Sequence, residues 1–270
     1  MDRQELPIGL IWEVIDHSCA FDATFTILFN IWKEYPVKWS DKFRHLRPYY
    51  SRGILTLEQA RDSVRTSLRG RAPEYFPYGT VGTSIDKLIT TMFHVDRTHV
   101  VGHRVCRTCE YADNREQHIF NPYICAIPSH SQIDQHPNGI PVSTWLADHL
   151  KRLPSRCPRC LLSRVSSRLT IDYEVTSVPC LLVLALDRPG LEYSQTLTFD
   201  VDGSLSILKL RGVIYGGDHH FTSRYITPTG DVWFHDGIST GRSCVFEGDL
   251  NNLPNGHLTS ARGKSAINLI

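Results

Sequence analysis

Apolar residues recur at helical spacing in the first third of the chain. From Cys19 to Glu34 they occupy nearly every helical face, a pattern typical of a helix that is buried on all sides. Asp16 and Ser18 can cap the start of this helix, and Pro36 stops it. Two amphipathic helices are predicted further on, over residues 56–69 and 83–93.

Short β-like runs replace the helical pattern from about residue 98, with turn residues between them. One short helix, over residues 143–150, interrupts the series. The predicted strands cover residues 99–104, 118–126, 163–173, 178–187, 196–201, 205–215, 220–227 and 231–236. Because the helices come first and the strands later, the order favours an α+β fold.

Composition and charge narrow the class of protein. The 270 residues are 41% hydrophobic and 21% charged, which is ordinary for a globular chain and too apolar for disorder. The net charge of +1 disfavours a partner with a phosphate backbone, so we expect no nucleic-acid binding. The N-terminus lacks a secretory signal, and the longest apolar run, residues 178–186, is too short to cross a bilayer. We therefore expect an intracellular protein, in the cytoplasm or nucleus, with no membrane partner.

Eight cysteines in a reducing compartment need a role other than disulfides. Two CxxC pairs can complete a tetrahedral shell of four thiolates around a structural zinc ion, whereas chance spacing or a redox dithiol is the alternative. The net charge disfavours a zinc-ribbon nucleic-acid binder. His103 and His118 are substitutes if one cysteine is not a ligand. The expected zinc ligands are Cys106, Cys109, Cys157 and Cys160.

Cys19 stands at the predicted N-terminus of the buried helix. There the helix dipole and unpaired backbone N–H groups favour a thiolate, and the same N–H groups can bind an oxyanion. A core cysteine that merely begins a core helix is the alternative interpretation.

A predicted hairpin near the C-terminus supplies the partners that such a nucleophile needs. If its strands pair symmetrically about Thr229, His220 lies diagonally from Asp236 on one face of the sheet. Asp236 would then orient the imidazole of His220, and His220 would serve Cys19 as general base. A slip of one residue would put the two on opposite faces. Two further histidines alternate to the other face and are expected to be solvated or structural: His219 and His235.

These residues resemble the ubiquitin-specific proteases, papain-like cysteine peptidases that remove ubiquitin or related modifiers. Residues 16–23, DHSCAFDA, look like the family's Cys box, and residues 178–186 are similar to a family strand that precedes the His box. Residues 208–221 resemble its strand, glycine-containing loop and His motif, and residues 233–236 resemble the following Asp box. The CxxC pairs fall where the family's zinc-bearing fingers insert, and residues 265–270 look like its terminal strand.

The resemblance implies a papain-like peptidase with thumb, palm and fingers. An α-helical thumb would cover residues 1–97, zinc-bearing fingers residues 98–170 and a β palm residues 171–270. The implied reaction is hydrolysis of the isopeptide or peptide bond after the C-terminal glycine of ubiquitin, by a monomer with structural zinc. Its implied catalytic residues are Cys19, His220 and Asp236.

Two departures from the family pattern leave alternatives open. Val14 stands where the family usually carries an oxyanion-binding Asn, so the oxyanion candidates are Asp16, His17 or backbone N–H groups alone. This departure also allows a weakly active or inactive module that binds a ubiquitin-like modifier. The spacing of Cys19 and Asp22, Cys-x-x-Asp, resembles a divergent branch whose substrate is SUMO, which makes SUMO the alternative modifier.

Gly216 and Gly217 form a predicted flexible loop, which the resemblance places beside the channel for the modifier's Gly-Gly tail. An ordinary strand connection is the alternative. Trp12, just before the Cys turn, is a candidate wall of the same cleft. The basic residues 151–164 are expected to be a solvated tip of the fingers. The remaining cysteines lie in or beside apolar runs and are predicted to be buried: Cys125, Cys180 and Cys244.

Overall fold

The chain forms two compact units, seen in a computed structural model. The first unit comprises Met1–Phe93, Val183–Leu186 and Leu210–Ile270, and the second comprises His94–Leu182 and Asp187–Lys209. The finer division into thumb, fingers and palm stays a prediction. The structure describes residues 6–40, 57–93, 100–113, 123–128, 130–136, 139–151, 155–163, 168–178, 180–186, 191–201, 203–254 and 256–270.

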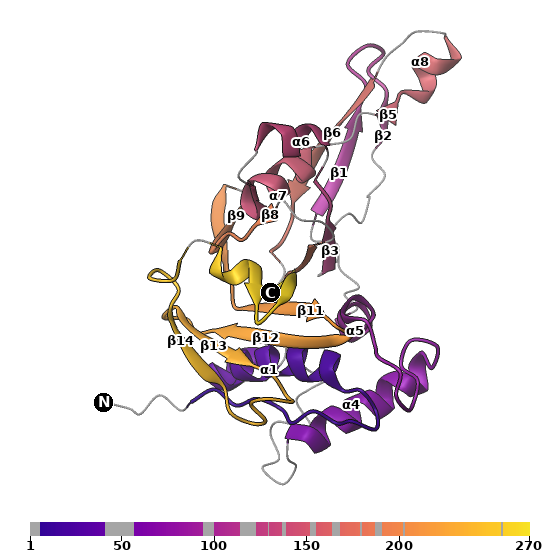
Figure 1. The fold of residues 1–270 in the computed structure, drawn as a ribbon. Helices are drawn as coiled ribbons and strands as arrows, with labels where there is room; N and C mark the ends of the chain where they lie inside the picture. Colours follow the sequence, from indigo (N-terminus) through magenta and orange to yellow (C-terminus); the bar gives the residue numbers. More distant parts are fainter. Residues whose placement is uncertain are drawn as a thin grey trace. The chain divides into compact units, whose positions relative to one another are not determined.

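Helices of the first unit surround the predicted buried helix. This helix, α1, runs over Cys19–Glu34, and its residues from Cys19 to Leu28 are all buried. Such an all-round apolar surface needs packing partners on every side, and α1 packs on the sheet strand β12, which covers His220–Ile226 (Figure 1). The other helices are α2 (Pro36–Ser40), α4 (Leu57–Arg71) and α5 (Ile85–Met92).

The start of α1 differs from the expected cap. Ser18 is the N-cap residue, but its hydroxyl makes no capping hydrogen bond to the helix backbone. It donates instead to the carboxylate of Asp22 at 2.6 Å and accepts the backbone N–H of Glu13 at 2.7 Å. The side-chain cap predicted for Ser18 is therefore wrong, because a buried carboxylate one turn further on competes for the hydroxyl.

One antiparallel sheet forms the body of the first unit, in the strand order β14-β13-β12-β11-β16-β7, with β15 beside β16. The predicted strand 205–215 is in fact two strands, β10 and β11, because the backbone N–H of Arg211 turns to the carbonyl of Ile270 between them. The strands are β7 (Val183–Leu186), β11 (Gly212–Gly217), β12 (His220–Ile226), β13 (Asp231–His235), β14 (Val245–Asp249), β15 (Ser260–Ala261) and β16 (Lys264–Leu269), with a short 3-10 helix η1 (His257–Thr259) before β15.

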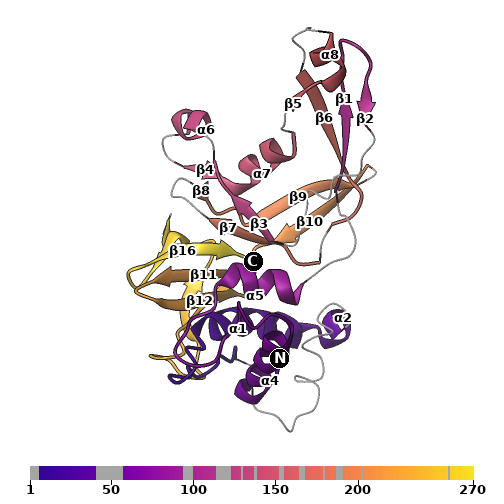
Figure 2. The same ribbon diagram turned by 90° about the vertical axis from the view of Figure 1, so that its right-hand side faces the viewer.

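The second unit holds a narrow sheet in the order β2-β1-β6-β5, with the short helix α8 following β5 (Figure 2). Its main pair is β1 with β6, antiparallel from Val100 opposite Val175 to Val105 opposite Thr170. The elements are β1 (Val100–Val105), β2 (Ala112–Asp113), β3 (Tyr123–Ala126), α6 (His130–Gln135), β4 (Ile140–Pro141), α7 (Val142–Lys151), β5 (Ser155–Arg156), α8 (Pro158–Leu162), β6 (Arg168–Val175), β8 (Leu191–Glu192), β9 (Thr196–Val201) and β10 (Ser204–Lys209).

The helices of the described segments are all too short or too polar to span a membrane. Of the two substitute metal ligands, His118 lies outside the described residues, and only the backbone of His103, within β1, is described.

Candidate active site and metal centre

The register of the β12–β13 hairpin brings His220 and Asp236 together. Ser223 pairs with His235 and Ile226 with Val232, so the strands are symmetrical about Thr229, as the sequence predicted. His220 begins β12, directly after a turn in which Asp218 and His219 both have positive φ (51° and 57°). His220 Nε2 lies 2.8 Å from Asp236 Oδ1.

Asp236 is held as a carboxylate by three donors. Burial raises the pKa of Asp236. Hydrogen bonds from His220, from the Ser239 hydroxyl at 2.8 Å and from the Ile238 backbone at 3.0 Å lower it by more, so the net change is downward. The side chains of His220 and Asp236 are 14% and 15% exposed, so solvent screens their pairing only partly. A fixed carboxylate on Nε2 leaves Nδ1 of the imidazole as the nitrogen that can take a proton.

Cys19 lies at the N-terminus of α1, and its thiol meets the backbone at the start of β12. Burial raises the pKa of the Cys19 thiol, a backbone hydrogen bond from Phe221 lowers it, and the nearby charge of Asp22 raises it. The backbone N–H groups of Ala20 and Cys19 itself also lower the pKa, and the net change is upward. Phe221 directly follows His220, so the backbone group that contacts the Cys19 thiol is one residue from the histidine. The same N–H groups could stabilise an oxyanion.

The two side-chain oxyanion candidates differ in their surroundings. The carboxylate of Asp16 accepts the backbone N–H of Gly79 at 2.8 Å and lies 3.4 Å from Nη1 of Arg65. Both contacts use the carboxylate oxygens of Asp16. His17 has a positive φ of 43°, and its ring centroid lies 6.2 Å from that of Trp12. Val14 is 55% exposed.

The candidate tail-channel residues lie next to His220, but not in a loop. Gly216 and Gly217 are the last residues of β11 and pair with Phe221 and His220. The prediction of a flexible loop is therefore wrong. The turn at residues 218–219 is so tight that β11 and β12 pair as far as Gly217 and His220. The half-buried indole of Trp12 stands edge-on to the imidazole of His220, with 6.3 Å between ring centroids.

Four sulfur atoms of the second unit converge on one point. The sulfurs of Cys106 and Cys160 are 3.6 Å apart, as are those of Cys109 and Cys157, and all four lie within 4.8 Å of one another. Zinc–sulfur bonds of about 2.3 Å in a tetrahedron put the sulfurs about 3.8 Å apart, so the cluster fits a zinc ion. A disulfide would need about 2.05 Å. Each close pair joins one CxxC turn to the other.

The other three cysteines are less buried than the sequence predicted. Cys125 and Cys180 are exposed and Cys244 is half-buried, so the prediction of burial is wrong for the first two. Cys125 occupies the exposed position in β3 between buried Ile124 and Ala126, because side chains alternate along a strand.

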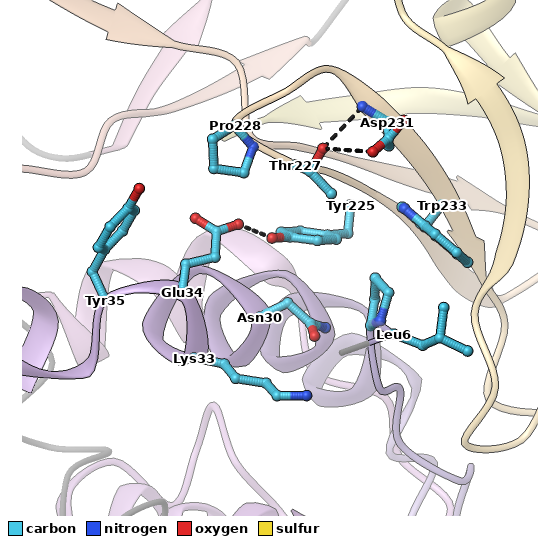
Figure 3. A pocket seen from close by; sticks show the side chains of 11 residues that line it. Leu6, Asn30, Lys33, Glu34, Tyr35, Tyr225, Thr227, Pro228, Asp231 and Trp233 are labelled. Carbon is cyan, nitrogen blue, oxygen red and sulfur yellow. Dashed lines mark hydrogen bonds between the residues drawn. The ribbon is translucent and has the colours of Figure 1, made fainter. Parts of the chain in front are cut away.

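A pocket of about 490 Å³ in the first unit lies away from these residues (Figure 3). It is lined by Glu34 and Tyr35 at the C-terminal end of α1 and by Tyr225, Pro228 and Trp233 of the β12–β13 hairpin, among others. Cys19 is at the opposite end of α1, and a 16-residue helix is about 24 Å long. The pocket is therefore separate from the Cys19 site.

A buried ion pair beneath the Cys turn was missed by the sequence analysis. Nη1 of Arg61, from α4, donates to Asp22 at 2.8 Å, to the carbonyl of Ile11 at 2.8 Å and to the hydroxyl of Ser18 at 3.2 Å. Arg61 and Asp22 are each 2% exposed. Burial raises the pKa of Asp22, while Arg61 and Ser18 lower it, and the net change is upward. Arg61 lies in a predicted surface helix, so no sequence signal marks it as buried.

Comparison with known proteins identifies the fold. No protein-family model matches the chain, and no curated protein does. A structure of the SAGA DUB module of Ubp8, Sgf11, Sus1 and Sgf73 bound to monoubiquitin is similar, with a TM-score of 0.60 and 12% identity over 100% of this chain and 69% of that chain. The same module bound to ubiquitin aldehyde gives 0.58 and 12%, over 100% and 70%. A third structure of the module, with an altered Ubp8 and a shortened Sgf11, gives 0.51 and 13%, over 100% and 69%.

The chain is thus a mixed helix and sheet protein with a fold like that of the ubiquitin-specific proteases. At this identity the likeness shows the fold alone.

Proposed function

We propose that the protein is a cysteine protease that hydrolyses the isopeptide or peptide bond after the C-terminal glycine of ubiquitin. The observation that carries the proposal is the pairing of His220 with Asp236 at 2.8 Å, together with the contact of the Cys19 thiol, at a helix N-terminus, with the backbone of Phe221. Nucleophile, base and orienting carboxylate are the parts that thiol hydrolysis requires. The similarity in fold to Ubp8-containing structures bound to ubiquitin supports ubiquitin as the substrate class.

In the first half of the reaction, Nδ1 of His220 takes the proton of the Cys19 thiol, and the sulfur attacks the carbonyl carbon of the glycine. Burial keeps the thiol protonated at rest, so the base is needed. The resulting oxyanion accepts hydrogen bonds from backbone N–H groups at the start of α1. The C–N bond then breaks, His220 protonates the leaving amine, and a thioester with Cys19 remains.

In the second half, His220 takes a proton from water and the hydroxide oxygen attacks the thioester carbon. The C–S bond breaks, and His220 returns its proton to the sulfur of Cys19. The modifier leaves with a carboxylic acid, which loses its proton to the solvent. Asp236 keeps the ring oriented and stabilises the imidazolium in both halves.

The four-cysteine cluster would hold a structural zinc ion. Four thiolates fill a tetrahedral shell and leave no open position for substrate or water. The zinc would therefore stabilise the second unit and take no part in the hydrolysis.

SUMO remains the alternative modifier, and the position of Asp22 bears on it. This residue carries the resemblance to the SUMO branch, yet its side chain is buried against Arg61. A side chain that is 2% exposed acts on the modifier only through the fold. The weakly active or inactive binding module is supported by Val14 alone. A monomer in the cytoplasm or nucleus stays the expectation for the intact protein.

The test uses ubiquitin and SUMO probes that carry a thiol-reactive C-terminus. We expect the ubiquitin probe to form an adduct with the wild-type protein and with Cys180→Ala, which removes an exposed cysteine, but none with Cys19→Ala. The measurement is the mass of the intact protein. An adduct with Cys19→Ala would exclude Cys19 as the nucleophile. An adduct with the SUMO probe alone would establish SUMO as the modifier. If neither probe formed an adduct, the inactive binding module would be the favoured function.

A further inference from the structure

The imidazole of His235 joins three segments of the first unit. Its ring is 1% exposed. Nε2 lies 2.9 Å from the carbonyl oxygen of Gly241 and 3.1 Å from that of Leu10, and Nδ1 lies 3.2 Å from the hydroxyl of Thr26. The three partners belong to the turn after β13, to the N-terminal segment and to α1.

These partners determine which nitrogen of His235 carries the proton. A carbonyl oxygen only accepts hydrogen bonds, so Nε2 must be the N–H that faces the carbonyls of Leu10 and Gly241. Nδ1 then accepts the hydroxyl hydrogen of Thr26. Burial lowers the pKa of His235, which agrees with a neutral ring. A phenyl ring of similar size would leave two carbonyls and a hydroxyl without a partner.

Each of the three segments also carries a residue of the candidate active site. Thr26 is two helical turns along α1 from Cys19. Leu10 is two residues before Trp12, whose indole stands against His220. The turn that contains Gly241 begins at Asp236, whose carbonyl accepts the backbone N–H of Thr240 at 2.8 Å.

Gly9 allows the close approach on which this junction depends. A Cβ atom at position 9 would lie 2.0 Å from Cδ2 and 2.2 Å from Nε2 of His235, which is far below van der Waals contact. The backbone of the segment is fixed at the same place, because the N–H of Gly9 donates to the carbonyl of Arg242 at 3.0 Å. The ring and the segment therefore fit together only with glycine at this position.

We propose that His235 is a positioning residue, which holds the α1 helix with Cys19, the segment with Trp12 and the turn with Asp236 in register through its three hydrogen bonds. This inference rests on the proposed function for its catalytic consequence. A shift of about 1 Å between nucleophile and base can slow a reaction about 100-fold, so a junction remote from the bond that breaks can still control the rate.

The test compares His235→Phe with His235→Gln, whose amide can both donate and accept, in the full chain. The first readout is the downfield proton NMR signal of His220 Nε2–H, assigned by its loss in Asp236→Asn. We expect His235→Phe to shift or broaden this signal, and His235→Gln to restore it in part. With a ubiquitin substrate we expect kcat to fall about 10- to 100-fold in His235→Phe, with KM within about twofold.

Gly9→Ala should reproduce the effect of His235→Phe, and the double variant should add little to either, because both break one junction. Gly70→Ala is the matched control, since a Cβ there meets no neighbour within 4 Å. A folded His235→Phe protein with the wild-type NMR signal and the wild-type kcat would overturn the proposal. If the wild-type protein turns over no substrate but His235→Phe still shifts the signal, the positioning role stands and the proposed function fails.

Discussion

At the residue scale, the neighbouring residues His235 and Asp236 have different surroundings and different roles. His235 and Asp236 are consecutive, so their side chains leave the hairpin on opposite faces. Asp236 faces His220, where donors lower its pKa, whereas His235 faces α1, where burial lowers its own pKa. A single step along the strand thus separates a candidate catalytic carboxylate from a buried structural imidazole.

The lowered pKa of His235 predicts how the stability of the protein depends on pH. In the unfolded chain the pKa of His235 is about 6.5. In the folded protein burial lowers this pKa, and the net change is downward although the charge of Asp236 raises it. The nearby His220 lowers the pKa as well. The unfolded state therefore binds more protons below about pH 6.5, and the free energy of unfolding falls as the pH falls through this range.

Urea unfolding at pH 8 and pH 5.5 measures this effect. We expect the wild-type protein to lose more stability between the two pH values than His235→Gln, which has no titrating ring. Other titrating groups, Glu34 and Asp22 among them, are present in both proteins and cancel in the comparison. Equal losses in the two proteins would show that His235 is not held neutral.

At the element scale, α4 supports the start of α1 through the buried pair of Arg61 and Asp22. The guanidinium also binds the carbonyl of Ile11 and the hydroxyl of Ser18, so one side chain of α4 secures the turn that precedes Cys19. Breaking a buried pair leaves one polar group without compensation, whereas replacing both partners with apolar residues can be nearly neutral.

We expect Arg61→Met to destabilise the protein by about 3–5 kcal/mol at pH 8, because the carboxylate of Asp22 loses its partner. The double variant Arg61→Met with Asp22→Leu should recover a large part of this loss. Arg242→Met is the matched control, because its pair with Glu58 is at the surface, with Arg242 54% exposed, and should contribute little to stability. Chemical unfolding measures all three. A double variant no more stable than Arg61→Met alone would contradict this account.

At the scale of the whole molecule, the four-cysteine cluster distinguishes the second unit from the first. The first unit has α1 packed on the sheet, with Val213, Ile214 and Phe234 fully buried. In the second unit, buried Cys106, Cys157 and Cys160 form a core cluster of their own, with Tyr111 packed against it. A zinc ion held by this cluster would stabilise the part of the unit whose local core is made of cysteines.

Removal of zinc should therefore loosen the second unit and spare the first. We expect a chelator, or Cys109→Ser, to increase hydrogen exchange in β1, β6 and α8, while exchange in α1 and β12 stays unchanged. Cys125→Ser is the matched control, because this cysteine is in the same unit but outside the cluster. Native mass spectrometry gives the zinc content. Unchanged exchange and melting after complete zinc removal would contradict a structural zinc site.

Features that depend on local pattern could be predicted from the sequence alone. The boundaries of α1, the symmetry of the hairpin about Thr229 and the pairing of two CxxC turns follow from helical spacing, turn residues and ligand spacing. Each depends on residues close together in the chain, or on a motif whose chemistry has few solutions.

The burial of polar side chains and the exposure of cysteines depend instead on how distant segments pack together. Arg61 belongs to a polar helix and His235 to an ordinary alternating strand, and each is buried because distant segments bring carbonyls and hydroxyls to it. Cys180 is exposed although apolar residues surround it in sequence. A residue's burial depends on what packs against it, and those partners lie many tens of residues away, where no local pattern records them.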